Sequence, residues 1–298
     1  MIGMTDTNEN SKFFGEHFEG MGAAWSAIFG EGHAGSIVEW LGTVAEEGKT
    51  GPNGLYHNKA ENRLVMMTEY PDTTGTRVGM IAVAENVTSP TTDRAFMMKS
   101  CMPLLEGVVN RLVIDEQRAW ANGVEGVVAA HLPVRDNEGP PVAFYAPYFF
   151  VERDRYVPET TVKVSLAAVA TAIRPAERKE IIIDSGPYFE EQLREFLEEN
   201  PEKTKEDFEP PVINLQGCRV LLPAPSVCEW QFRFPVQAIE ERSLLGIKLY
   251  KITATYVGNG DIMIKGTLYA SERVLNGYVP KLGDDVEGML WLTGTIAE

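Results

Sequence analysis

The sequence predicts a mainly β protein of the α+β class, in which two related small antiparallel β-barrel modules follow an N-terminal segment of helices and a hairpin. Three observations predict this fold. Short apolar runs separated by polar turns fill most of the chain after residue 107. The pattern Phe-Tyr-Ala followed by Tyr-Val-Pro at residues 144–158 returns as Leu-Tyr-Ala and Tyr-Val-Pro at residues 268–280. Between these copies, residues 187–199 carry the clearest helical pattern, followed by an acidic, proline-containing stretch.

Length and composition are those of a globular chain with room for about two domains. The 298 residues are 44% hydrophobic and 23% charged, which are ordinary values for a folded protein. We expect an N-terminal segment at 1–106 packed on a first β module at 107–200, an acidic linker at 201–217 and a second β module at 218–298. The repeated pattern is interpreted as one β module used twice.

The chain is strongly acidic, with 43 Asp and Glu residues against 27 Lys and Arg residues and a formal net charge of −16. A surface of this sign repels the phosphates of nucleic acids and of anionic membranes. In addition, no apolar run approaches the roughly 20 residues of a membrane span. Nucleic acid is therefore a disfavoured partner, and no membrane insertion is expected.

The cysteine pattern predicts a reducing compartment. Cys101, Cys218 and Cys228 form no CxxC pair, and an odd number of unclustered cysteines is typical of reduced thiols and not of a disulfide framework. The N-terminal residues lack the basic and apolar regions of a secretion signal. We therefore expect a cytoplasmic protein.

Two helices are predicted near the N-terminus. Apolar residues recur at helical spacing over residues 14–29, and a second helix is expected over residues 36–47, with Ser36 as its N-cap. We interpret both as core elements; a partner-binding helical hairpin is the alternative, which the absence of a basic polar face disfavours. The intervening residues 30–35 fit the dinucleotide pattern GxGxxG, but no strand precedes them, so a glycine-rich turn is preferred.

Residues 63–70 and 76–87 predict a β-hairpin joined by a turn rich in Pro, Asp, Thr and Gly. Residues 91–106 are ambiguous. Their Met and Leu residues fit one face of a helix that Pro103 would kink or end. We interpret that face as core packing, with an adaptable Met-rich binding surface as the alternative.

Four strands are expected in the first module, at residues 108–115, 124–132, 142–150 and 162–173. The helix at 187–199 follows them. From Asp184 to Pro211 there are ten acidic residues against three Lys or Arg residues. We interpret this segment as a solvated connector between the modules, with an acidic docking element for a basic partner as the alternative.

Five strands are expected in the second module, at residues 218–222, 229–240, 247–257, 261–274 and 286–296. The turn Gly258–Gly260 is its clearest hairpin signal, because adjacent residues that tolerate positive φ suit a tight connection between strands. Five strands with one long irregular link, residues 275–285, are typical of a partly open barrel of the OB type. Both modules are therefore predicted to be OB-like.

No strong metal, nucleophile or cofactor motif occurs in the sequence. The four histidines are scattered, no GxSxG or phosphate-binding loop is present, and no cofactor is expected. The one candidate cation site is a set of carboxylates near the start of the last strand, which could bind calcium or magnesium through oxygen: Asp261, Asp284, Asp285 and Glu287. An ordinary acidic turn is the preferred interpretation, so no metal is expected.

The favoured function is non-enzymatic: a binding or assembly module whose loops at residues 151–161 and 275–285 contact a protein or a small ligand. Each loop brings a tyrosine and a proline together, which provides rigid apolar contact area at low entropic cost. The candidate binding residues are Tyr156, Pro158, Tyr278, Pro280 and Trp291. The alternative is that each tyrosine plugs the end of its own barrel.

Two other functions are kept as alternatives. An enzyme could place its site at the module interface, with His131, Asp115 and Glu240 brought together by the fold. Single-stranded nucleic-acid binding by OB-like barrels would use aromatic residues that stack on bases, and it would also require a basic groove. The aromatic candidates for that function are Trp230, Phe232, Tyr250 and Tyr256.

Overall fold

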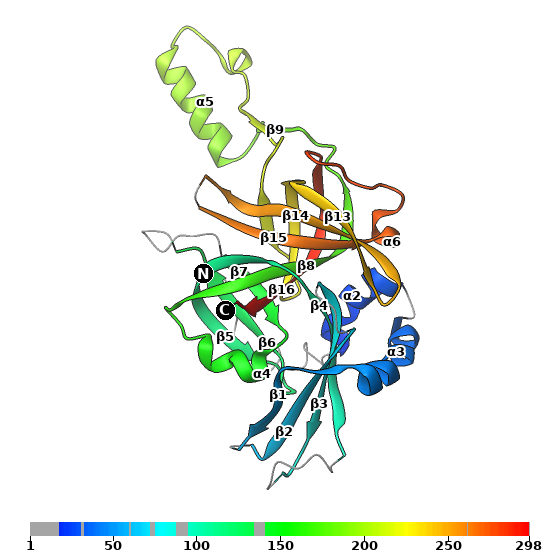
Figure 1. The fold of residues 1–298 in the computed structure, drawn as a ribbon. Helices are drawn as coiled ribbons and strands as arrows, with labels where there is room; N and C mark the ends of the chain where they lie inside the picture. Colours follow the sequence, from blue (N-terminus) through cyan, green and yellow to red (C-terminus); the bar gives the residue numbers. More distant parts are fainter. Residues whose placement is uncertain are drawn as a thin grey trace.

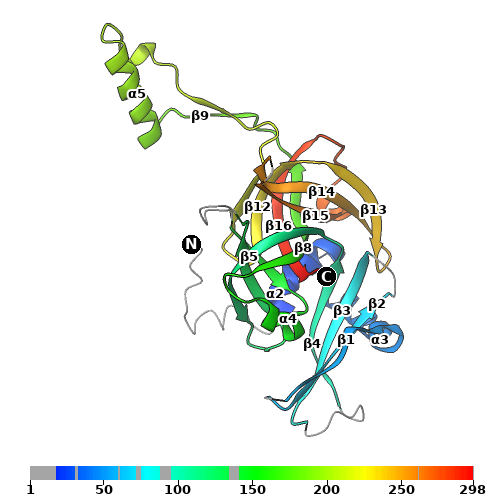
Figure 2. The ribbon, with the colours of Figure 1, turned by 60° about the vertical axis from the view of Figure 1, so that its left-hand side comes forward.

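The computed structural model describes residues 18–30, 33–59, 61–71, 75–87, 95–133, 141–260 and 262–297. They form two β units that share strands, a four-stranded sheet with two helices, and an arm that projects from one end (Figures 1 and 2). Strands outnumber helices, which confirms the predicted mainly β class. None of the helices in the described residues is long and apolar enough to cross a membrane.

The N-terminal segment is an antiparallel sheet in the order β1-β2-β3-β4 with two helices before it. Its elements are α2 (Phe18–Phe29), α3 (His33–Glu47), β1 (Lys49–Asn58), β2 (Arg63–Tyr70), β3 (Thr76–Ala84) and β4 (Met97–Leu105). Both predicted helices and the β2–β3 hairpin are confirmed, although the first four residues of the first predicted helix lie outside the described part of the chain. The N-cap predicted at Ser36 is wrong, because α3 begins at His33 and Ser36 lies inside the helix.

Residues 91–106, which the sequence left ambiguous, contain no helix in their described part. Residues Met97–Leu105 instead form strand β4, which pairs with β3 and buries five consecutive residues, Ser100–Leu104. Pro103 is tolerated there because β4 is an edge strand, so the missing N–H of proline need not bond a second neighbour. The sequence also does not predict strand β1, whose Gly, Asn and Pro residues are poor strand formers.

Five strands form a β-barrel in the order β5-β6-β7-β16-β8, and the pairing of β8 with β5 closes the ring. The parallel pair is β7 with β16. A short helix, α4, and a 3-10 turn, η1, lie between β7 and β8, so the strand predicted to reach residue 150 ends earlier. The bounds are β5 (Val108–Ala119), β6 (Gly126–His131), β7 (Pro141–Ala146), α4 (Phe149–Glu152), η1 (Arg153–Arg155), β8 (Thr161–Pro175) and β16 (Asp285–Ile296).

The long strands β8 and β16 continue into the second β unit, whose order is β11-β12-β16-β8-β15-β14-β13 with β8 parallel to β15. Strand β12 leads into β13 through Val236 and Gln237, and the Gln237 N–H donates to the Thr253 carbonyl at 3.0 Å. The β14–β15 hairpin predicted at Gly258–Gly260 is confirmed. The bounds are β11 (Val220–Pro223), β12 (Glu229–Pro235), β13 (Ala238–Leu244), β14 (Ile247–Asn259), β15 (Ile262–Ser271) and α6 (Glu272–Leu275).

The hairpins of the two units have the same register. In the barrel, Phe144 of β7 lies opposite Val128 of β6, and in the second unit Leu268 of β15 lies opposite Ile252 of β14. Both residue numbers rise by the same amount, 124 (268 − 144 and 252 − 128). One offset therefore relates the second and third strands of each unit.

The shared strands obey the same offset. In the barrel, Tyr145 of β7 lies beside Thr293 of the parallel strand β16, and in the second unit Tyr269 of β15 lies beside Val169 of the parallel strand β8. Tyr269 is 124 residues after Tyr145, and Val169 is 124 residues before Thr293. In chain order, β8 is the fourth strand of the barrel and β16 is its fifth. In the second unit, β16 holds the position of the fourth strand and β8 holds that of the fifth. Ala168 of β8 lies opposite Leu292 of β16, and these two residues are also 124 positions apart.

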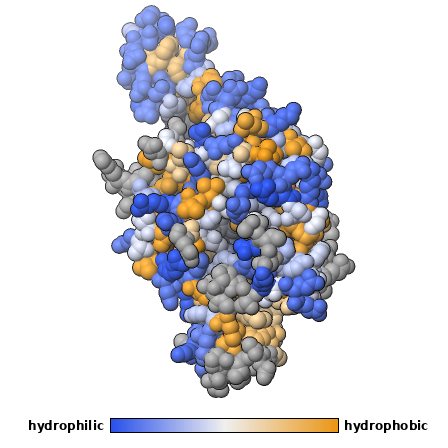
Figure 3. Space-filling model, viewed as in Figure 1, coloured by the Kyte–Doolittle hydropathy of each residue, from blue (hydrophilic) through white to orange (hydrophobic). Residues whose placement is uncertain are grey.

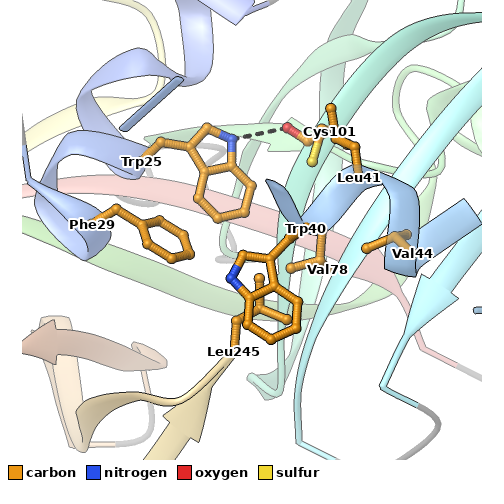
Figure 4. Close-up of a pocket in the computed structure, with 8 residues that line it drawn as sticks. All are labelled: Trp25, Phe29, Trp40, Leu41, Val44, Val78, Cys101 and Leu245. Carbon is orange, nitrogen blue, oxygen red and sulfur yellow. Dashed lines mark hydrogen bonds between the residues drawn. The ribbon is translucent and has the colours of Figure 1, made fainter. Parts of the chain in front are cut away.

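One continuous apolar core connects both β units with α2, α3 and the four-stranded sheet. Figure 4 shows the contact between the N-terminal segment and the second unit, where Leu245 from the β13–β14 turn faces Trp40 and Val78. Trp25 of α2 donates its indole N–H to the Cys101 carbonyl of β4 at 3.0 Å. The first contact joins the four-stranded sheet to the second unit, and the second joins α2 to that sheet.

Residues 176–217 form the projecting arm (Figure 2). It consists of the two-stranded ribbon β9 (Glu180–Ile182) and β10 (Val212–Asn214), the predicted helix α5 (Pro187–Glu199), which is confirmed, and a 3-10 turn, η2 (Lys205–Asp207). At its base, the N–H of Ala176 donates to the Asp285 carbonyl and that of Gly217 to the Asp285 carboxylate, both at 2.9 Å. The segment expected as a linker, 201–217, is the part of the arm that returns to the barrel. Strands β5 to β8 of the barrel precede the arm in the chain, and strand β16 follows it.

Limited trypsin digestion should cut the arm first, at the exposed Lys203 and Lys205. The nicked chain should still elute as one particle in size-exclusion chromatography, because β8 and β16 lie on opposite sides of the cut and remain paired. Denaturing electrophoresis checks that the cut has occurred. Fragments that separate without denaturant would contradict the shared strands.

Candidate functional site

Tyr156 lies inside the barrel. It is fully buried, its ring stacks on Phe149 at 6.5 Å and meets Phe144 edge-on at 6.3 Å, and its hydroxyl donates to Glu152 at 2.8 Å. Burial raises the pKa of both Tyr156 and Glu152. The geometry therefore fits the interpretation of Tyr156 as a plug, while its neighbours Val157 and Pro158 are exposed.

Tyr278 occupies the corresponding loop of the second unit. It is partly buried, and its hydroxyl donates to Asp284 at 3.0 Å. Pro280 is buried, whereas Val279 and Leu282 are exposed. In both loops, the residue after the tyrosine is exposed, so the apolar area available to a partner comes from the two valines and Leu282, with a part from the half-buried Tyr278 and none from Tyr156.

Trp291 is buried, and the described candidate metal ligands bond to other groups of the chain. Trp291 is 3% exposed on β16 and does not form part of a surface. Asp284 accepts from Tyr278 and from the Lys281 N–H, Asp285 holds the base of the arm, and Glu287 pairs with Arg174 and Arg233. The fourth candidate, Asp261, lies outside the described residues. In the part of the chain that is described, no group of three or more His, Cys, Asp or Glu residues could hold a metal ion.

The fold brings together two of the residues proposed for an enzyme. His131 Nδ1 and Asp115 Oδ1 are 2.6 Å apart across the bulge of β5, and His131 Nε2 is buried without a hydrogen-bond partner. Glu240 instead pairs with Arg242 on β13 of the second unit. The three residues therefore do not form one site.

The same strand positions of the second unit hold a neutral pair. Gln237, at the break between β12 and β13, donates from its side chain to the Thr255 hydroxyl at 3.0 Å. These residues correspond to Asp115 and His131 when the strand registers are matched. A side-chain bond across the bend of the first strand is therefore present in both units.

Glu125 is a buried carboxyl group between the four-stranded sheet and the barrel. It is fully buried and accepts hydrogen bonds from the Ser100 hydroxyl of β4 at 2.7 Å, from the Tyr145 hydroxyl of β7 at 2.6 Å and from the Asn122 side chain. Burial raises its pKa to about 7, against these three bonds, which lower it. Glu125 thus ties the four-stranded sheet to the barrel; its partners lie on distant strands, so no sequence motif reveals it.

A cleft of about 350 Å³ lies between the four-stranded sheet and the barrel. Its walls include Arg77 and Tyr148, and both of these side chains bond to Glu69 of β2. The cleft is large enough for a small ligand. Glu69 already engages Arg77 Nη1 and the Tyr148 hydroxyl, whereas Arg77 Nε is buried without a hydrogen-bond partner among the described residues.

The outward faces of the two central hairpins are covered by other parts of the chain. On β7, Tyr145 packs against Trp120 with ring centroids 5.2 Å apart, next to Glu125. On β15, the Tyr269 hydroxyl donates to the Glu106 carbonyl at 3.0 Å. The aromatic residues considered for base stacking are buried as well: Trp230, Phe232, Tyr250 and Tyr256. These side chains are not available to stack on bases.

Comparison with protein families, with curated proteins and with solved structures finds no match. The function must therefore be argued from the geometry of this chain alone.

Replacement of Glu125 by Gln should remove a pH dependence of stability. Because burial raises the folded-state pKa from 4.5 to about 7, the folded protein retains a proton that the unfolded chain has lost between these values. The contribution of this group to stability is full below about pH 4.5 and is lost as the pH rises through about 7. Relative to wild type, E125Q should gain about 3 kcal/mol of unfolding free energy between about pH 5 and about pH 8.

Urea unfolding at several pH values measures this difference. The control is Glu85→Gln, since Glu85 is exposed. If the difference between E125Q and wild type does not change with pH, Glu125 does not titrate as its burial requires.

The double variant D115Q/H131T should keep its unfolding free energy within about 1 kcal/mol of wild type, because it installs the side-chain pair of the second unit. The single variant H131T leaves Asp115 without the imidazole and should be less stable by about 1 kcal/mol. A double-mutant cycle by urea unfolding measures the coupling. A broad activity screen runs in parallel: turnover by wild type that the stable double variant lacks would support the enzyme alternative.

Proposed function

We propose that this chain is a non-enzymatic binding or assembly protein whose loops at residues 151–161 and 275–285 contact a protein partner. The observation that carries the proposal is the exposure of apolar side chains in both loops, 47% for Val157, 43% for Val279 and 73% for Leu282. The tyrosines beside the two valines are held by Glu152 and Asp284, which makes the loops rigid. Rigid apolar side chains lose little entropy when a partner binds.

We infer that the scaffold is a duplicated pair of OB-like barrels. Three features support this inference. In both units the third strand lies parallel to the fifth, and a short helix, α4 or α6, precedes the fourth strand. A single offset relates the central hairpins and the shared strands. The carbonyls of Ile114 and Val236 each accept the N–H of a loop residue with positive φ, Glu159 and Gly283 respectively.

The usual ligand face of an OB-like barrel lies on its second and third strands. Here that face is covered by Trp120 over Tyr145 in one unit, and in the other by residues 106–107 beside Tyr269. Combined with the net charge of −16, this covering disfavours nucleic-acid binding and leaves the loops as the contact surfaces.

We also propose that the protein works in the reducing cytoplasm. Its three cysteines are unpaired, and Cys101 and Cys228 are buried. Burial raises the pKa of Cys101 to about 12, so its thiol stays protonated and unreactive. The arrangement is that of inert core thiols.

The test introduces charge into the loops. The triple variant V157D/V279D/L282D should fold normally, because all three side chains are exposed, and should lose most partner binding in affinity capture from extracts of the source organism. The comparison variant is Leu222→Asp, which places one carboxylate at an exposed apolar position outside both loops. Equal capture by the triple variant and wild type would contradict a contact role for the loops.

Two further measurements separate the alternatives. Tyr156→Ala should destabilise the fold by about 3–5 kcal/mol, since it empties the end of the barrel. Wild type should produce no salt-resistant shift of a single-stranded oligonucleotide in a gel. A shift that persists at physiological salt would favour the nucleic-acid alternative.

A further inference from the structure

The arm at residues 176–217 carries apolar residues that the described part of the chain does not cover. Ile182 of β9 lies opposite Val212 of β10, and Ile181 lies opposite Ile213 on the other face. Ile182, Val212 and Ile213 are 53%, 56% and 45% exposed. A two-stranded ribbon is marginally stable by itself, and apolar residues on both faces are a feature of surfaces that another molecule covers.

The tip of the arm is preformed. Phe208 on the returning chain packs against Phe189 and Phe196 of α5, with ring centroids 5.5 and 5.3 Å apart. Lys203 and Lys205 lie over two of these rings. The helix is thus fixed before any partner binds, which reduces the entropic cost of docking.

An open groove runs along the side of α5. Leu193 and Leu197 form its apolar floor, one helical turn apart, with the charged residues Glu190, Arg194 and Glu198 beside them, and its volume is about 370 Å³. Figure 3 shows hydrophobic residues on the arm surrounded by hydrophilic ones.

The charge of the arm selects the partner. Residues 176–217 contain twelve acidic and five basic residues, and α5 alone has five Glu against one Arg. This charge repels nucleic acid, anionic lipid and a second copy of the arm. A basic segment with apolar anchors matches the Leu floor and the acidic excess of α5, in which Glu190 and Glu198 outnumber Arg194 beside the groove.

We propose that the arm is a docking element for a basic amphipathic segment of a partner protein, which places Leu- or Ile-type side chains on Leu193 and Leu197 and Lys or Arg side chains beside Glu190 and Glu198. This inference rests on the proposed binding function and adds a second contact surface to the loops. The exposed ribbon of β9 and β10 extends the same surface towards the barrels.

The experiment measures binding of a labelled synthetic Lys/Leu amphipathic peptide to the full chain by fluorescence anisotropy, with a Glu/Leu peptide of the same length as the negative control. Two arm variants are compared: L193S/L197S, which removes the apolar floor, and E190Q/E198Q, which neutralises the two glutamates beside it. The matched control for charge is E46Q/E47Q, which neutralises two exposed carboxylates at the end of α3.

The Lys/Leu peptide should bind wild type and E46Q/E47Q equally. Its affinity should fall about tenfold or more for L193S/L197S and about threefold to tenfold for E190Q/E198Q. Circular dichroism checks that α5 remains folded, and replacement of residues 176–217 by a short Gly-Ser link should abolish binding.

Three results would overturn the inference: no binding of the peptide, binding that survives loss of the arm, or an equal loss in E46Q/E47Q and E190Q/E198Q, which would reflect net charge alone. None of these affects capture through the loops. Failure of the arm and failure of the proposed function are therefore distinguished by whether V157D/V279D/L282D changes capture.

Discussion

The antiparallel pairing of β8 with β16 is the interaction on which the rest of the structure depends. It extends from Val164 opposite Ile296 to Pro175 opposite Val286, and both strands take part in the barrel and in the second unit. Neither unit is complete by itself, because each contains both β8 and β16. The four-stranded sheet, the N-terminal helices and the arm are attached to a framework that this pair creates, which explains why one apolar core spans both units.

Local patterns predict much of the fold. Alternation and turn residues locate the β14–β15 hairpin, and Pro187 and the aromatic spacing locate α5. Strand β4 is missed because its Met and Leu residues fit a helix equally well, and only pairing with β3 decides. Strand sharing is missed because the partners are distant in sequence, and long-range pairing has no local signature.

Which side chains the two candidate loops expose could not be predicted from the sequence. In each loop, the tyrosine and the following valine point in different directions. The hydroxyl of Tyr156 bonds to Glu152, which precedes it in the chain, whereas that of Tyr278 bonds to Asp284, which follows it. The sequence does not show which carboxylate holds each tyrosine. The structure turns both tyrosines inward. Glu125 is beyond prediction for a similar reason, since its bonds come from β4, β7 and its own loop.

The position of β16 has a consequence for how the protein folds during synthesis. The ribosome releases β5 to β8 long before residues 285–296, and until then β7 and one side of β8 present open strand edges. Closure of the barrel must therefore wait for the last segment of the chain, and non-local pairing of this kind is intrinsically slow. A nascent chain with exposed edges is prone to aggregate, so a chaperone that shields β7 and β8 should improve the yield of folded protein.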